Sequence, residues 1–277
     1  MKYLLFKVEG FIYFFCYGEI IMELALLQKD IIINIISSLL GAALSILATI
    51  VIRYFRLNRP IRKIWNNLIQ DDEKFSFITT ALVTSEHKIY TAVPSAEFTA
   101  LSDLLAQFKK VYKNIEFDHY PSGKFPFSKI GGPLLLVGGP RHNDITKLLF
   151  ERVHLPVRFD GHSLVDKDNV RSTPLAINQT IIKDYGIIIS IPNPFHDNNR
   201  IILLAGCHAY GTNAAIRAMT WPFLKETLKH ISSPDYAVVV EALVVNEFVS
   251  KPKIVKVFEI TELVGASMPV IESAHPI

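Results

Sequence analysis

Residues 31–52 form a run of twenty-two residues without a charged side chain, IIINIISSLLGAALSILATIVI. At about 1.5 Å per residue, a helix of this length crosses the ~30 Å hydrocarbon core of a bilayer. Asn34 is the only strongly polar residue in the run. A buried helix of a soluble protein usually has a polar stripe or is shorter. The run therefore predicts a transmembrane helix over residues 31–54.

Basic residues follow this helix, and no acidic residue lies among them. On the preceding side, Glu23, Lys29 and Asp30 carry a net charge of minus one. Lysine and arginine mark the cytoplasmic flank of a span. We therefore predict a single-pass protein of the cell inner (plasma) membrane, with its N-terminus outside and its C-terminal domain in the cytoplasm. Residues 55–74 are predicted to form a basic juxtamembrane linker. The candidates for binding anionic lipid headgroups, in this linker or just before it, are Arg53, Arg56, Arg59, Arg62 and Lys63.

Small residues recur at every fourth position of the predicted span. Such a stripe lets two helix backbones approach closely in lipid, so it favours a homo-oligomer. It consists of Ser37, Gly41, Ser45 and Thr49.

The N-terminal residues 1–30 are apolar and aromatic but interrupted by charge, so their role stays open. They are consistent with a poor first span, an interfacial helix or an upstream choice of start site. The favoured interpretation is that Met22, which opens MELALLQKDIII, is an alternative start, or that residues 1–21 are dispensable. A cleaved signal peptide is not expected, because no small-residue cleavage site precedes a polar segment.

Residues 75–277 alternate apolar strand patterns with helix patterns. The chain is 50% apolar and 20% charged, which excludes a disordered protein. Short continuous apolar strands such as LLLV at 134–137 favour a mostly parallel sheet covered on both faces. Residues 236–246 and 253–261 read as an antiparallel β-hairpin. The predicted fold class is α/β: the transmembrane helix plus one Rossmann-like cytosolic domain with a C-terminal antiparallel β-hairpin.

The first glycine loop, GGPRHND, lies between an apolar strand and a helix. Glycines at such a turn allow positive φ and close approach of a ligand to the backbone, and the helix N–H groups attract anions. An arginine there adds charge for a phosphate. The predicted ligand-binding residues of this loop are Gly138, Gly139, Arg141 and Asn143.

The second loop, GCHAYGTN, again joins an apolar strand to a helix. Its glycines have the spacing of a phosphate loop, but Thr212 and Asn213 replace the lysine and the hydroxyl residue that hold phosphates and Mg²⁺. This difference excludes an ATPase or GTPase of that class and leaves anion binding by the backbone. The predicted ligand-binding residues are Gly206, His208, Gly211, Thr212 and Asn213. Ligands of open α/β sheets bind beyond the carboxyl ends of strands, so both loops are expected to form one cleft.

No metal site is predicted, because the nine histidines and two cysteines lack ligand spacing. No cofactor is expected other than a nucleotide ligand. The net charge of +3 is too small to indicate direct nucleic-acid binding. No catalytic residue is assigned, and a Cys207–His208 pair is disfavoured because adjacent residues rarely face each other. The polar stretch at 159–163, with Asp166 and Asp168, predicts a solvated loop or, as the alternative, a source of a catalytic carboxylate. Glu241, in an apolar strand, either needs a partner or a raised pKa or points to solvent.

The segments LLVGGPRHNDITKLLFE and RIILLAGCHAYGTNAAIRAM together resemble the glycine-rich loops of Rossmann-like nucleotide-binding domains, specifically of the SLOG and nucleoside-deoxyribosyltransferase-like families. The order of a membrane helix and then such a domain is similar to membrane effectors of prokaryotic antiviral defence systems. The resemblance covers under a third of the chain. It implies a cytosolic sensor that acts on the membrane through its anchor, with a protein of a defence operon as partner. Deoxyribosyltransferase-like chemistry would need a carboxylate that attacks the sugar, and no motif identifies one.

Two functional hypotheses follow. The first is a membrane-anchored effector or sensor that binds an anionic nucleotide-type ligand, or a partner protein, and perturbs the bilayer by oligomerising. The second is a tethered enzyme that cleaves or transfers the N-glycosidic bond of a nucleotide. A membrane-tethered scaffold with an empty cleft is the remaining alternative, with the hairpin as a docking edge.

Overall fold

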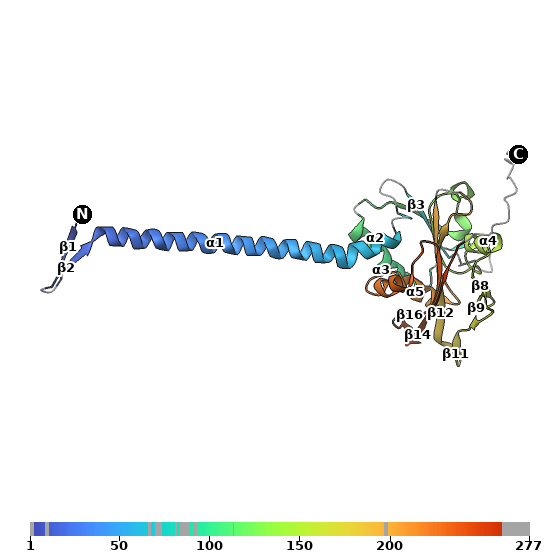
Figure 1. The fold of residues 1–277 in the computed structure, drawn as a ribbon. Helices are drawn as coiled ribbons and strands as arrows, with labels where there is room; N and C mark the ends of the chain where they lie inside the picture. The colour runs from blue at the N-terminus through green and yellow to red at the C-terminus, as the bar shows by residue number, and fades with distance from the viewer. Residues whose placement is uncertain are drawn as a thin grey trace. The chain divides into compact units, whose positions relative to one another are not determined.

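The computed structural model describes residues 3–8, 11–65, 68–69, 74–80, 82–83, 89–90, 93–112, 114–196 and 199–261. The chain divides into two compact units, Met1–Arg56 and Leu57–Ile277. Figure 1 shows the elements of both units along the chain. We call the second one the globular unit.

The first unit contains a hairpin and a long helix. Strands β1 (Tyr3–Val8) and β2 (Phe11–Cys16) pair antiparallel, and helix α1 (Tyr17–Arg53) follows. The helix thus begins well before the uncharged run, within the segment 1–30 whose role the sequence left open. All side chains that the structure describes in α1 are exposed. By length and composition, the helical residues Ala25–Trp65 are apolar enough to cross a membrane.

A π-helical stretch, Tyr54–Asn58, and helix α2 (Arg59–Trp65) follow α1 in sequence. We expected a juxtamembrane linker over residues 55–74, but Ile61, Ile64 and Trp65 are buried in the core of the globular unit. Their spacing places these apolar side chains on one face of α2, and burying that face stabilises the helix. Part of the segment therefore belongs to the packed domain.

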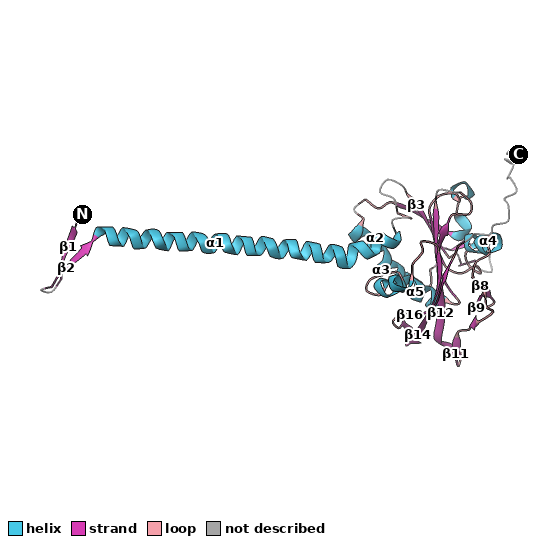
Figure 2. Ribbon diagram, viewed as in Figure 1, coloured by secondary structure: helices cyan, strands magenta, loops and turns pink. Residues whose placement is uncertain are grey.

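A nine-stranded mixed sheet forms the centre of the globular unit (Figure 2). One half consists of neighbouring parallel strands, β6 (Phe117–Pro121), β3 (Phe75–Thr79), β7 (Leu134–Val137) and β13 (Arg200–Gly206). The other half is antiparallel and consists of β12 (Thr180–Pro192), β11 (Leu175–Ile177), β14 (Tyr236–Val245), β15 (Phe248–Val249) and β16 (Lys253–Glu259).

Both faces of this sheet are covered, because its central strands are apolar on both sides. Ile188 packs on one face and its neighbours Ile187 and Ile189 on the other. The first face carries α2 together with α3 (Ser95–Val111), α5 (Ala209–Ala218) and α6 (Leu224–His230). The second carries α4 (Asp144–Arg152) and a small sheet of β8 (Val157–Asp160), β9 (Ser163–Asp166) and β10 (Arg171–Ser172).

Shorter elements complete the described part. They are the paired strands β4 (Leu82–Val83) and β5 (Ile89–Tyr90) and the 3-10 turns Ser122–Lys124 and Phe127–Lys129. The predicted α/β class is confirmed, and the antiparallel half is larger than the sequence pattern indicated. Strands β14 and β16, at the predicted hairpin, pair antiparallel between Tyr236↔Glu259 and Glu241↔Lys253.

Candidate functional site

A cleft of about 230 Å³ opens at the carboxyl ends of the parallel strands. Because β3, β7 and β13 are parallel neighbours, the loops that follow them leave the sheet at the same edge. These loops line the cleft together with the first turn of α3 and the β8–β9 turn. The expectation that both glycine loops contribute to one cleft therefore agrees with the fold.

Five of the nine predicted ligand-binding residues line the cleft. They are Gly139, Arg141, Gly206, His208 and Thr212. The other four do not line it, and each has a structural role described below.

In the first loop, Asn143 and Gly138 hold the turn itself. Asn143 is fully buried: its Oδ1 accepts hydrogen bonds from the backbone N–H groups of Ile145 and Thr146, each at 3.1 Å, and caps α4. Its Nδ2 donates to the carbonyl oxygen of Val137 at 3.0 Å. Gly138 has φ of 101°, and a Cβ there would lie 2.1 Å from the Thr80 methyl group. Both residues shape the loop, whereas Gly139 and Arg141 line the cleft.

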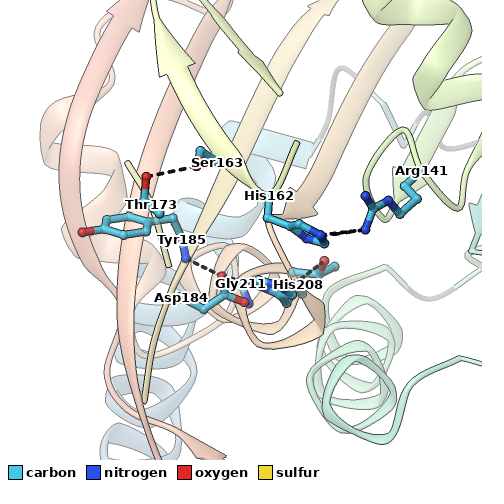
Figure 3. Close-up of polar contacts among 9 residues, drawn as sticks. Arg141, His162, Ser163, Thr173, Asp184, Tyr185, His208 and Gly211 are labelled. Atoms are coloured by element: carbon cyan, nitrogen blue, oxygen red, sulfur yellow. Dashed lines mark hydrogen bonds and ion pairs between the residues drawn. The ribbon is translucent and has the colours of Figure 1, made fainter. Parts of the chain in front are cut away.

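In the second loop, a carboxylate of the protein lies at the start of α5. Asp184, on β12, is fully buried, and its Oδ2 accepts the Gly211 N–H at 2.6 Å. Its Oδ1 accepts the N–H of Tyr185 at 2.9 Å (Figure 3). The N–H of Gly211, predicted to bind a ligand anion, is therefore taken by an internal anion that satisfies the helix N-terminus. Asp184 is a residue that the loop spacing could not indicate, because it lies on another strand.

Asn213 faces away from the cleft, toward α3. It lines a separate groove, and its Nδ2 donates to the carbonyl oxygen of Ala96. Among the residues described, Asn213 Oδ1 is buried without a hydrogen-bond partner. Asn213 thus joins α5 to the first turn of α3.

Arg141, His162 and His208 form a row at the cleft (Figure 3). The Arg141 guanidinium lies 3.0 Å from His162 Nε2, and the His162 ring stacks on the His208 ring with centroids 5.0 Å apart. His208 Nδ1 lies 3.5 Å from Asp184 Oδ1. The positive charge of Arg141 lowers the pKa of His162. His162 belongs to the β8–β9 turn, a polar stretch in sequence that predicted only a solvated loop or a carboxylate.

Glu97, in the first turn of α3, places a carboxyl group in the wall of the cleft. Only 4% of the residue is exposed, and burial raises its pKa to about 7. The nearby hydroxyl groups of Thr212 and Thr80 oppose this rise but do not outweigh it. Within the described part of the chain, Glu97 Oε2 has no hydrogen-bond partner. A buried acid that titrates near neutral pH is a frequent property of functional sites.

The remaining polar residues noted in the sequence are explained by structural contacts. Asp166 and Asp168 pair with Lys256 at 2.6 and 2.7 Å, so neither serves the cleft. Glu241 Oε2 accepts a hydrogen bond from Tyr185 Oη at 2.8 Å. Burial raises the pKa of the Cys207 thiol, which disfavours a reactive thiolate. Among the side chains that the structure describes, no group of three or more His, Cys, Asp or Glu could hold a metal ion.

The predicted membrane residues lie on both units. Ser37, Gly41, Ser45 and Thr49 are exposed on α1, where Thr49 Oγ1 donates to the Ser45 carbonyl oxygen at 2.8 Å. Of the five basic residues, Arg62 is engaged within the globular unit. Its Nη2 donates to the Val111 carbonyl oxygen at 3.3 Å. The other basic residues are Arg53, Arg56, Arg59 and Lys63, all on exposed helical positions.

No protein-family model and no curated protein matches the chain. The cleft combines two kinds of polar group. Its accessible charge is a guanidinium beside two imidazoles, a combination that recognises phosphate or carboxylate groups. Its interior offers a carboxyl group and hydroxyl groups, which recognise hydrogen-bond donors.

Proposed function

We propose that the chain is a membrane-anchored sensor whose Rossmann-like domain binds a small anionic, nucleotide-type ligand. The proposal takes α1 as a single span of the cell inner membrane, with the globular unit in the cytoplasm. The apolar side chains of α1 are exposed in the chain alone, which supports this arrangement. A membrane would bury this apolar surface, whereas water would not. The basic residues after residue 52 support the orientation.

One observation carries the proposal. The loops after β3, β7 and β13 line a single cleft, and the polar groups at its two ends differ in charge. Arg141, with His162 and His208, provides a cationic rim, whereas Glu97 provides an acidic interior. A phosphate beside Glu97 would meet no positive charge, whereas Arg141 carries one, so the phosphate belongs at the rim. A sugar hydroxyl or base amino group, which donates hydrogen bonds, belongs at Glu97. A nucleotide has both parts.

In the same proposal, self-association of α1 is the means by which the protein acts on the membrane. A role in antiviral defence rests on the resemblance of the two glycine loops, and of the order of membrane helix and domain, to membrane effectors of defence systems. The partners are then membrane lipids, further copies of the chain and a protein of the same defence operon. The tethered N-glycosidic enzyme is retained as the second candidate, because Glu97 supplies a carboxyl group that the sequence did not identify. It requires release of a free base from the bound nucleotide.

We expect a nucleotide-type ligand to raise the unfolding temperature of the full chain in detergent micelles. A panel of NAD, ATP and cyclic di- and oligonucleotides is suitable. At one hundred times its dissociation constant, a ligand adds ~2.7 kcal/mol, which corresponds to roughly 5–10 °C for a domain of this size. Arg141→Ala should weaken binding by roughly 10- to 100-fold, because a charge-assisted hydrogen bond contributes ~1.5–3 kcal/mol.

Arg158→Ala is the matched control, since Arg158 is also an exposed arginine but does not line the cleft. Equal weakening in both variants would count against the site. No shift with any compound would contradict a nucleotide ligand and favour a partner protein. Chromatography of the same mixtures detects free base. Release of the base from NAD would favour the N-glycosidic enzyme over the sensor.

We expect Gly41→Leu to weaken self-association of the chain in vesicles by at least about tenfold, a change of ~1.4 kcal/mol. A Cβ at Gly41 meets no atom within 4 Å, so the substitution leaves the chain's own packing unchanged. It fills the space that a second helix would need. Energy transfer between labelled copies measures the effect. Ala43→Leu, on the opposite side of α1, is the control, and equal loss in both variants would refute the stripe as the interface.

A further inference from the structure

Helix α3 is held at both ends by contacts of different kinds. Its first turn contains Glu97, in the wall of the cleft, and its last residue is Val111. Its seventeen residues span about 26 Å. The last turn contacts α2, the first helix of the globular unit, which follows α1 and the π-helical stretch in sequence. One rigid element thus contacts both the cleft and the segment that leads to the membrane helix.

At the cleft, consecutive residues of α5 hold consecutive residues of α3. The Thr212 hydroxyl lies beside the Glu97 carboxyl group, and the Asn213 amide donates to the Ala96 carbonyl oxygen. These contacts leave buried oxygens unused, because Glu97 Oε2 and Asn213 Oδ1 have no partner among the residues described. Burial therefore disfavours an ionised Glu97, and the hydroxyl groups beside it supply too few hydrogen bonds to compensate.

At the other end, α2 closes the C-terminus of α3. Arg62 donates to the Val111 carbonyl oxygen, one of the groups that the end of a helix leaves without an intrahelical partner. The Arg62 guanidinium also lies 5.2 Å from the centre of the Tyr112 ring. Trp65 packs edge-on against Phe108, with ring centroids 4.7 Å apart, and is fully buried. A displacement of α3 along its axis must therefore change the surroundings of Trp65.

We propose that α3 couples the cleft to α2, so that ionisation of Glu97, or a ligand donor that holds it ionised, repositions the contacts of Arg62 and Trp65. This inference rests on the proposed function, because it gives ligand binding a route to the membrane helix. Rigid secondary elements are among the structures that carry coupling between sites, and α3 is one continuous helix from Ser95 to Val111. The ionised carboxylate draws the first turn toward a donor or water, and the last turn moves with it.

Other titratable groups also face the cleft and must be separated from Glu97. The loops opposite carry Arg141, His142, Cys207 and His208, and the β8–β9 turn carries His162. On α3 itself the nearest acid is Asp103, which is exposed. A substitution that removes only the Glu97 charge isolates its contribution.

The test uses the fluorescence of Trp65 in the full chain in nanodiscs. The chain has two tryptophans, so Trp221→Phe leaves Trp65 as the single reporter. Between pH 5.5 and 8.5 we expect its emission to shift to longer wavelength in one transition centred near pH 7. Glu97→Gln in the same background should abolish the transition, whereas Asp103→Asn should keep it.

An unchanged Trp65 emission across this pH range would overturn the coupling, and so would a transition that persists in Glu97→Gln. The stability of the same variants reports separately whether Glu97 titrates. Ligand-induced thermal shifts that depend on Arg141 test the proposed function by another measurement. The coupling can therefore fail while the ligand site stands, and the two failures are distinguishable.

Discussion

Replacing Gly211 with alanine is expected to lower the free energy of unfolding of the globular unit by about 3 kcal/mol or more. A Cβ at this position would lie 2.1 Å from the Tyr185 carbonyl oxygen and 2.7 Å from its carbonyl carbon. Both are backbone atoms of β12, which is paired on both sides and cannot move aside. To avoid this clash, α5 must move away from β12, which lengthens the 2.6 Å hydrogen bond from the Gly211 N–H to Asp184. Overpacking alone costs ~1–3 kcal/mol, and a weakened buried hydrogen bond to Asp184 adds to it.

Gly161→Ala is the matched control for this prediction. Gly161 also lies in a turn beside the cleft, with φ of 60°, but a Cβ there would meet no atom within 4 Å. Only the left-handed backbone penalises alanine, at roughly 1–2 kcal/mol. Urea unfolding of the full chain in micelles, followed by circular dichroism, measures both variants. Equal losses of stability would show that the contact with β12 is not the reason for glycine at position 211.

The glycine spacing of the second loop illustrates what a sequence pattern leaves open. Glycines after a strand and before a helix fit a phosphate loop, and they fit equally well the close packing of a helix against a strand. Gly206 and Gly211 serve the second purpose, because a Cβ on Gly206 would lie 2.1 Å from the Thr212 nitrogen. The difference depends on Asp184, whose carboxylate fills the anion position from β12. No local pattern links Asp184 to this loop, since they meet only in the folded chain.

Features set by local pattern were predictable from the sequence. The uncharged run indicated the long helix, and buried strands followed by glycines indicated neighbouring loops at one edge of the sheet. Features set by distant contacts were not predictable. The β8–β9 turn brings His162 onto His208, and α2 buries Trp65 against Phe108. Glu97 belongs to the first turn of α3, but Thr80 and Thr212, whose hydroxyl groups lie beside its carboxyl group, come from other elements.

We expect Glu97→Gln to stabilise the globular unit at alkaline pH and to have little effect near pH 4.5. The native pKa of Glu97 is about 7, above the ordinary 4.5. Between these values the folded chain binds a proton that the unfolded chain has released, so the free energy of unfolding falls as pH rises. Each pH unit in this window costs ~1.36 kcal/mol, which gives roughly 3 kcal/mol above pH 7. Glutamine cannot ionise and therefore avoids this loss.

Urea unfolding of both proteins at intervals from pH 4.5 to 8.5 measures the difference directly. Asp103→Asn is the control, because Asp103 is an exposed acid on the same helix and should leave the wild-type pH dependence unchanged. Parallel curves for wild type and Glu97→Gln would contradict a buried, titrating carboxyl group. A ligand that donates a hydrogen bond to Glu97 should restore part of the free energy of unfolding that wild type loses at alkaline pH, and should have no such effect on Glu97→Gln. A natural chain that keeps a destabilising acid in its cleft is expected to recover that free energy on binding, and a ligand that stabilises wild type more at pH 8 than at pH 6 would demonstrate the recovery.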